Sequence, residues 1–203
     1  MKLFDGGKAP NPRRVRMFLA EKGIEVPLEH VDMGALGHRG EAVTKANPLQ
    51  RLPVLELDDG STIAESVAIC RYFEELHPDP PLMGRGAEQV ARIEMWQRRM
   101  ELNLLMSVAM VFRHAHPAMA EWEKPQIAEL SESQKPKVLS FLRWFDGEMA
   151  DREFVAGDAY SIADITGTIA IDFMKPARIA VPDDLANVNR WHAAMRERPN
   201  YAA

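Results

Sequence analysis

The sequence predicts two parts of different class: an α/β domain over residues 1–77 and an all-helical domain over residues 87–203. In residues 1–77 the patterns follow the order strand, helix, strand, loop, strand, strand, helix, which is typical of a small domain with a four-stranded mixed sheet. A proline-rich break, His77-Pro78-Asp79-Pro80-Pro81, interrupts this order, so residues 78–86 are interpreted as a linker. Beyond the linker only helical periodicity is found.

The N-terminal elements are indicated by local signals. Lys2-Leu3-Phe4 reads as a short strand closed by glycines. Asn11 is a favoured N-cap and Pro12 is favoured at a first helical position, so we expect a helix from there to Gly23. Residues 26–31 form the next strand candidate, and the glycine- and charge-rich residues 32–46 read as a loop with one helical turn.

The stretch from Asn47 to Phe73 organises the domain. Residues 54–57 are expected to form a strand, Asp58-Asp59-Gly60-Ser61 a turn, and residues 62–64 the returning strand. From Ser66 onwards the apolar residues fall at helical spacing. Glu65 and Ser66 therefore stand at a helix N-terminus, where unpaired backbone N–H groups and the helix dipole favour an anion.

Four helices are expected in the second half, over residues 87–116, 133–149, 161–174 and 183–198, with Pro136 at or near the start of the second. Ser161 and Asp164 have the spacing of a capping box. A catalytic role for Asp164 is possible, but capping explains the pattern at once and is preferred.

Composition narrows the classes of function. The 203 residues are 46% hydrophobic and 27% charged, with a formal net charge of −5, so a nucleic-acid surface is not expected. No signal peptide and no run of ~18 apolar residues is found, so no membrane association is expected. A single cysteine, Cys70, excludes an internal disulfide and a CxxC pair, and a reducing cytoplasm is the simplest location.

Three segments in register carry a family resemblance: APNPRRVRMFLAEKGI at 9–24, NPLQRLPVLELDDGSTIAES at 47–66 and FVAGDAYSIADI at 154–165. With the long helical pattern at 87–116 they span nearly the whole chain. The sequence resembles a cytosolic-type glutathione transferase, of a bacterial or fungal kind, whose thioredoxin-like N-terminal domain precedes a helical domain.

The resemblance implies a glutathione site in the first domain. Ser66 matches the residue that holds the γ-glutamyl carboxylate, and Glu65 the residue near the ammonium group. Leu52 matches the residue whose backbone pairs with the cysteinyl amide, and Pro53 the family's cis-proline. Gln50 and His38 match positions that reach the glycyl carboxylate. Read without the family, Ser66 is also a helix cap, Pro53 a strand opener and His38 a solvated loop residue.

The sequence departs from the family pattern where the thiol is activated. Residues 5–12, DGGKAPNP, contain no Ser, Thr, Tyr or Cys, and Ala9 aligns with the usual Ser or Cys. The remaining donors are the backbone N–H groups of residues 9, 11, 13 and 14, the Asn11 amide and the Lys8 charge, any of which favours a thiolate. A capping role for Asn11 is an equal alternative.

A second source of donors is expected on the long helix of the helical domain, which in this family faces the thiol. Arg113 and His114 are candidate catalytic groups, with Arg113 preferred. Met106 and Met110 can share a face with Arg113 and offer an adaptable electrophile pocket. The simpler alternative is that these cations complement the dipole of a helix end.

These residues together predict a homodimeric glutathione transferase that conjugates glutathione to an apolar electrophile, with no metal and no protein-bound cofactor. The competing hypotheses are a non-catalytic protein that binds glutathione or apolar ligands, a structural or interaction module, and a glutathione-dependent disulfide reductase. The missing hydroxyl favours the non-catalytic binding protein. The intact set of glutathione-matching residues disfavours the structural or interaction module.

Overall fold

The computed structural model describes all residues 1–203 and divides into two compact units, residues 1–82 with 202–203 and residues 83–201. The first unit contains β1 (Lys2–Asp5), α1 (Pro10–Glu21), β2 (Leu28–His30), η1 (Gly37–Arg39), α2 (Glu41–Ala46), β3 (Val54–Glu56), β4 (Thr62–Ala64) and α3 (Ser66–Leu76). The second contains α4 (Gly86–Arg99), η2 (Met100–Leu105), α5 (Met106–Ala115), η3 (Pro117–Met119), α6 (Ala128–Glu148), α7 (Ile162–Met174) and α8 (Ala186–Arg196).

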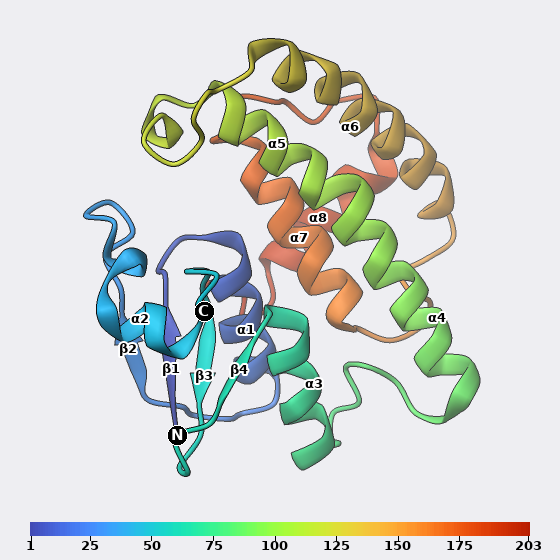
Figure 1. The fold of residues 1–203 in the computed structure, drawn as a ribbon. Helices are drawn as coiled ribbons and strands as arrows, with labels where there is room; N and C mark the ends of the chain where they lie inside the picture. The colour runs from blue at the N-terminus through green and yellow to red at the C-terminus, as the bar shows by residue number, and fades with distance from the viewer. The chain divides into compact units, whose positions relative to one another are not determined.

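The sheet of the first unit has the strand order β2-β1-β3-β4. β1 pairs with β2 in parallel and with β3 antiparallel, and β3 pairs antiparallel with β4, so the predicted four-stranded mixed sheet is confirmed. Figure 1 shows α1 and α3 side by side in this unit, and their packing brings the starts of the two helices together. That meeting of helix starts positions the candidate site.

The second unit is entirely helical, as expected. α4, the π-helical η2 and α5 run on as one rod, with α6 alongside α5 (Figure 1). α7 contacts α4, η2, α5 and α8, and eleven of its thirteen residues are buried, which makes it the centre of the helical core. None of the helices is both long and apolar enough to cross a bilayer.

The cap of α7 follows the sequence pattern. The Ser161 hydroxyl accepts a hydrogen bond from the Ala163 N–H, and the Asp164 carboxylate accepts one from the Ser161 N–H at 3.0 Å, which completes the capping box. Asp164 also accepts hydrogen bonds from the Val155 N–H at 2.8 Å and from Trp191 Nε1 at 3.1 Å. A fully buried carboxylate that accepts hydrogen bonds from three residues, Val155, Ser161 and Trp191, is structural, which supports the preferred interpretation.

Three predicted helix starts are wrong. The start of α8, expected at Asp183 or Asp184, lies at Ala186. α1 begins at Pro10 with Ala9 as its N-cap, so Asn11 is not the cap. Both prolines fit, because none of the first four N–H groups of a helix has an intrahelical partner. α6 begins at Ala128 and contains Pro136 in its interior. Its first turn is anchored by Ser131, whose hydroxyl donates to the Val111 carbonyl at 3.3 Å.

Candidate functional site

The start of α3 has the features of an anion site. Glu65 is the N-cap residue, and its backbone has φ 69° and ψ 117°, a conformation that is strained for a residue other than glycine. No side chain caps the helix, so its first N–H groups keep their hydrogen-bonding capacity. Ser66 follows as the first helical residue and is buried. The Glu65 side chain is exposed beside it.

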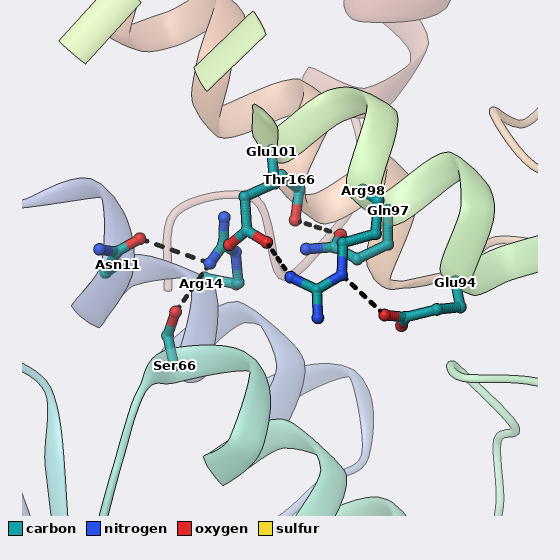
Figure 2. A network of polar contacts seen from close by, with 8 residues as sticks. All are labelled: Asn11, Arg14, Ser66, Glu94, Gln97, Arg98, Glu101 and Thr166. Atoms are coloured by element: carbon teal, nitrogen blue, oxygen red, sulfur yellow. Dashed lines mark hydrogen bonds and ion pairs between the residues drawn. The ribbon is translucent and has the colours of Figure 1, made fainter. Parts of the chain in front are cut away.

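A buried arginine lies beneath this helix start. The Arg14 side chain, on α1, is 1% exposed, and its Nη1 donates to Ser66 Oγ at 2.7 Å (Figure 2). The same nitrogen donates to Asn11 Oδ1 at 3.4 Å. One guanidinium group therefore joins the first turn of α1 to the first turn of α3. Its charge adds to the positive ends of both helix dipoles.

Residues 47–53, directly before β3, form one side of the candidate site, which we call the cradle. Asn47 is buried, its Nδ2 donates to the Arg51 carbonyl at 3.0 Å, and its own carbonyl accepts from the Gln50 N–H at 2.8 Å. This turn places Gln50 at φ 54°. The bond between Leu52 and Pro53 is cis. Because β3 begins only at Val54, the backbone of Leu52 lies outside the strand pairing.

Leu52 connects this cradle to the loop between β1 and α1. Its side chain is buried in a cluster with Phe4 and Val54, and a Cβ placed on Gly6 would lie 3.3 Å from Leu52 Cδ1. The same Cβ would lie 3.3 Å from Pro12 Cγ. The cis-proline segment and the start of α1 are thus neighbours. The residues that match the cysteinyl contact and the thiol loop lie together in one unit.

His38 is buried, which is contrary to the alternative that it is a solvated loop residue. It is 3% exposed in η1, and burial lowers the pKa of its imidazole, with the positive charges of Arg39 and Arg51 adding to the effect. His38 is therefore neutral at neutral pH. Both arginine residues are exposed. The positive charge near His38 comes from Arg39 and Arg51. His38 itself can offer only a neutral hydrogen bond to a carboxylate.

The loop that should activate the thiol offers fewer donors than its sequence suggests. The Ala9 N–H donates to the Gly6 carbonyl and the Arg13 N–H donates to the Ala9 carbonyl. Pro10 and Pro12 have no N–H. The first turn of α1 therefore keeps a single backbone donor, the N–H of Asn11, beside the Asn11 side-chain amide.

Asp5 holds this loop from the sheet side. The carboxylate is 1% exposed at the end of β1, accepts a hydrogen bond from the Gly7 N–H at 2.9 Å and forms an ion pair with Arg16. His30 Nδ1 lies 3.4 Å from the same carboxylate. A buried anchor of this kind fixes the position of the loop before α1.

The candidate residues of the second unit have structural partners of their own. Arg113 is half-buried and pairs with Glu123 at 3.5 Å. His114 is buried, and its Nδ1 accepts a hydrogen bond from the Ile127 N–H at 3.2 Å, directly before α6. This contact ties α5 to the start of α6. It gives His114 a structural role, and the catalytic roles of Arg113 and His114 stay predictions.

One residue of the predicted electrophile pocket, Met106, lies at a groove of the second unit. Met106 is 51% exposed and lines an open groove of about 710 Å³ between η2, α5 and α6. The residues lining the groove are Leu102, Asn103, Met106, Ser107, Gln134, Pro136, Lys137, Ser140, Phe141 and Trp144. Met110 and Arg113 are absent from this lining. The three residues therefore share a helix but not this groove, and their contact with an electrophile stays a prediction.

Sequence reasoning missed Arg14 and Asn47 as parts of the site. Arg14 stands three residues after Asn11 and directly before Val15, on the side of α1 that is buried. An arginine on an apolar helix face was the available signal, because a buried cation needs partners. Asn47 opens the NPLQ segment, and an asparagine before a proline is a turn signal.

The comparisons with known proteins cover both units. The model of the glutathione S-transferase N-terminal domain matches residues 9–76, and that of the glutathione S-transferase C-terminal domain matches residues 103–199. Glutathione S-transferase 2 of Saccharomyces cerevisiae is 34% identical over 203 residues, with 98% of this chain and 87% of the relative covered.

Solved structures agree with the sequence matches. The crystal structure of Gtt2 from Saccharomyces cerevisiae has a TM-score of 0.94 at 34% identity, with 100% of this chain and 99% of that chain covered. A class Gtt2 glutathione S-transferase of Vibrio parahaemolyticus has a TM-score of 0.87 at 33% identity, with 100% and 96% covered. With family models over both units and relatives of this similarity over its full length, the chain belongs to the glutathione S-transferase family.

Proposed function

We propose that the protein binds glutathione on the first unit, with the γ-glutamyl carboxylate at the start of α3. The observation that carries this proposal is the uncapped helix start with Ser66 at its first position and the Arg14 guanidinium 2.7 Å from the Ser66 hydroxyl. A carboxylate there gains backbone N–H donors, a hydroxyl and a buried positive charge. Glu65 meets the ammonium group, and the backbone of Leu52 pairs with the cysteinyl amide.

The reaction that this arrangement supports is transfer of the glutathione sulfur to an electrophilic carbon. The thiol releases its proton to solvent, the sulfur electron pair forms a carbon–sulfur bond, and the leaving group departs with its bonding electrons. The protein contributes proximity, and the N–H and amide of Asn11 stabilise the thiolate at the start of α1. Glutathione is a substrate here, so no metal or bound cofactor enters the proposal.

A direct test combines binding, ionisation and turnover. Calorimetric titration measures the affinity for glutathione, and ultraviolet absorbance of the bound thiolate followed against pH measures its pKa. Turnover is followed with a generic aryl halide. Binding with a lowered thiol pKa and measurable turnover is the expected result. Absence of glutathione binding would overturn the whole proposal.

A non-catalytic glutathione-binding protein is the second candidate, because residues 5–12 lack a hydroxyl or thiol side chain. Glutathione binding with an unshifted thiol pKa and no turnover would favour this candidate over the enzyme. A disulfide reductase needs a good thiolate but no enzymic cysteine. Reduction of a mixed disulfide without aryl halide turnover would point to it.

We also propose, on family membership, that the protein is a cytoplasmic homodimer. Sedimentation equilibrium should give twice the mass of a single chain. A single-chain mass at assay concentration would contradict the dimer without affecting the proposed site, since every residue of the glutathione cradle named above lies within one unit.

A further inference from the structure

We propose that Arg14 is a positioning residue that orients both donors of the glutathione site, the Ser66 hydroxyl and the Asn11 amide. This inference rests on the proposed function and extends it to a residue that does not itself contact the substrate. The Nη1 atom of Arg14 lies 2.7 Å from Ser66 Oγ and 3.4 Å from Asn11 Oδ1, and these residues belong to two different helix starts.

The first step concerns the Ser66 hydroxyl. A guanidinium group has only donors, so Ser66 Oγ must accept the hydrogen bond from Arg14. The hydroxyl hydrogen is then directed away from the guanidinium and can donate to an anion. Accepting a hydrogen bond from a cation also polarises the hydroxyl and strengthens it as a donor.

The second step applies the same reasoning to the Asn11 amide. Since Arg14 can only donate, the amide oxygen of Asn11 faces it and the amide nitrogen points the other way, as Figure 2 shows. Asn11 is exposed, so its nitrogen can reach a ligand. Asn11 does not cap α1, and its amide is therefore available for this contact.

The third step is that one rigid group fixes both donors. Arg14 is 1% exposed within packed helices, and its planar guanidinium group loses little freedom when its Nη1 atom forms these bonds. Preorganised donors lower the cost of binding because they need not be ordered by the ligand. The carboxylate end and the thiol end of glutathione are thereby set by the same side chain.

A double-mutant cycle tests the Ser66 branch by calorimetric titration with glutathione. Arg14→Met keeps the apolar stem and removes the donor, and we expect the dissociation constant to rise about tenfold. Ser66→Ala should cost about as much. In the double variant the dissociation constant should rise only about twentyfold, far less than the product of the two single effects, because without Arg14 the hydroxyl is no longer oriented. Multiplicative effects would overturn the proposal.

The Asn11 branch is read from the thiolate absorbance of bound glutathione. Asn11→Ala and Arg14→Met should raise the pKa of the bound thiol in the same direction, with no further rise in the double variant. An Arg14→Met protein with an unchanged thiol pKa would remove this branch. A purely structural arginine would lower the melting temperature and leave both couplings absent.

Two controls complete the design. Arg14→Lys keeps the charge but not the rigid planar group that holds Nη1 between the two acceptors, so we expect binding to stay severalfold weaker than in the wild type. Full recovery would show that charge alone matters and overturn the orienting role. The same cycle is run with Arg14→Lys if Arg14→Met does not fold.

Arg92→Gln removes an equal charge from an exposed pair with Glu88 and should not alter binding. Absence of glutathione binding by the wild type would instead defeat the proposed function itself.

Discussion

At the scale of single residues, two of the buried charged groups of this protein, Arg14 and Asp164, lie at helix starts. Arg14 lies between the first turns of α1 and α3, and Asp164 closes the capping box of α7. A charge inside a protein is tolerated where hydrogen bonds replace its hydration. For Arg14 we propose that the partners are donors oriented towards a ligand, whereas the partners of Asp164 fix the start of α7.

His38 and Arg51 differ in charge, since the buried imidazole of His38 is neutral at neutral pH and the guanidinium of Arg51 is positive. Because burial lowers the pKa of His38, replacement by Gln should change the dissociation constant of glutathione by less than about twofold. Arg51→Gln removes a formal charge from the carboxylate end and should raise the constant about threefold. Calorimetric titration at low and high salt checks this, since the Arg51 effect should shrink as salt screens it. A larger loss for His38→Gln than for Arg51→Gln would contradict the assignment.

Asp164 should make the stability of the helical unit depend on pH. Burial raises the pKa of its carboxyl from 3.8 to about 6, although hydrogen bonds from Val155, Trp191 and Ser161 oppose the rise. The native state thus holds this proton more tightly than the unfolded state does. The resulting stability is complete below about pH 4 and is lost as the pH rises through about 6, an effect of about 3 kcal/mol.

Denaturant unfolding of the wild type and of Asp164→Asn measures this dependence, followed by tryptophan fluorescence. All four tryptophans, at positions 96, 122, 144 and 191, belong to the second unit and report on it. The free energy of unfolding of the wild type relative to the variant should fall between pH 4 and pH 7. A constant difference over that range would show that the carboxyl does not titrate there.

At the scale of elements, the sequence predicts what is encoded locally. The strands at 54–56 and 62–64 follow from alternating or apolar runs around a turn, and the α7 cap follows from residues within one helical turn. The start of α6 was missed because its two contacts with α5 join residues far apart in the sequence. The bond from the Ile127 N–H to His114 joins residues 13 apart, and the bond from Ser131 to the Val111 carbonyl joins residues 20 apart. The bond from Arg14 to Ser66 joins residues 52 apart and cannot be read from periodicity.

The packing of α7 on α8 gives a prediction at this scale. A Cβ on Gly167 would lie 2.8 Å from Trp191 Cη2, and Trp191 is 1% exposed and held by its bond to Asp164. Gly167→Ala should therefore lower the free energy of unfolding by about 1–2 kcal/mol, because overpacking outweighs the gain in helix propensity.

A second helical glycine supplies the matched control. A Cβ on Gly147, in α6, would have no atom within 4 Å, so Gly147→Ala should stabilise the protein by up to about 1 kcal/mol. Denaturant midpoints of the two variants measure the opposite signs. Stabilisation by both substitutions would mean that Trp191 moves aside at little cost.

At the scale of the whole molecule, the order of elements was predictable because the two units differ in their hydrophobic periodicity and are separated by prolines. The individual roles within the site were less predictable. The resemblance assigns contacts with glutathione to Gln50, Leu52 and Ser66, and these stay predictions, whereas Asn47 and Arg14 make contacts that only the fold creates. Short sequence motifs therefore indicate the residues proposed to contact glutathione, but not the residues that hold them in position.

Binding to the native state alone should stabilise the folded protein. At a glutathione concentration about a hundred times its dissociation constant, the expected gain is about 2.7 kcal/mol, visible as a higher melting temperature by circular dichroism. A glutathione analogue in which the cysteine carries no thiol should give nearly the same gain, because the proposed site binds the carboxylates, the ammonium group and the backbone. Ser66→Ala should reduce the gain for both ligands at the same concentrations. A gain that required the thiol would place the main recognition at Asn11 and the α1 loop, and would overturn the carboxylate-centred site at the start of α3.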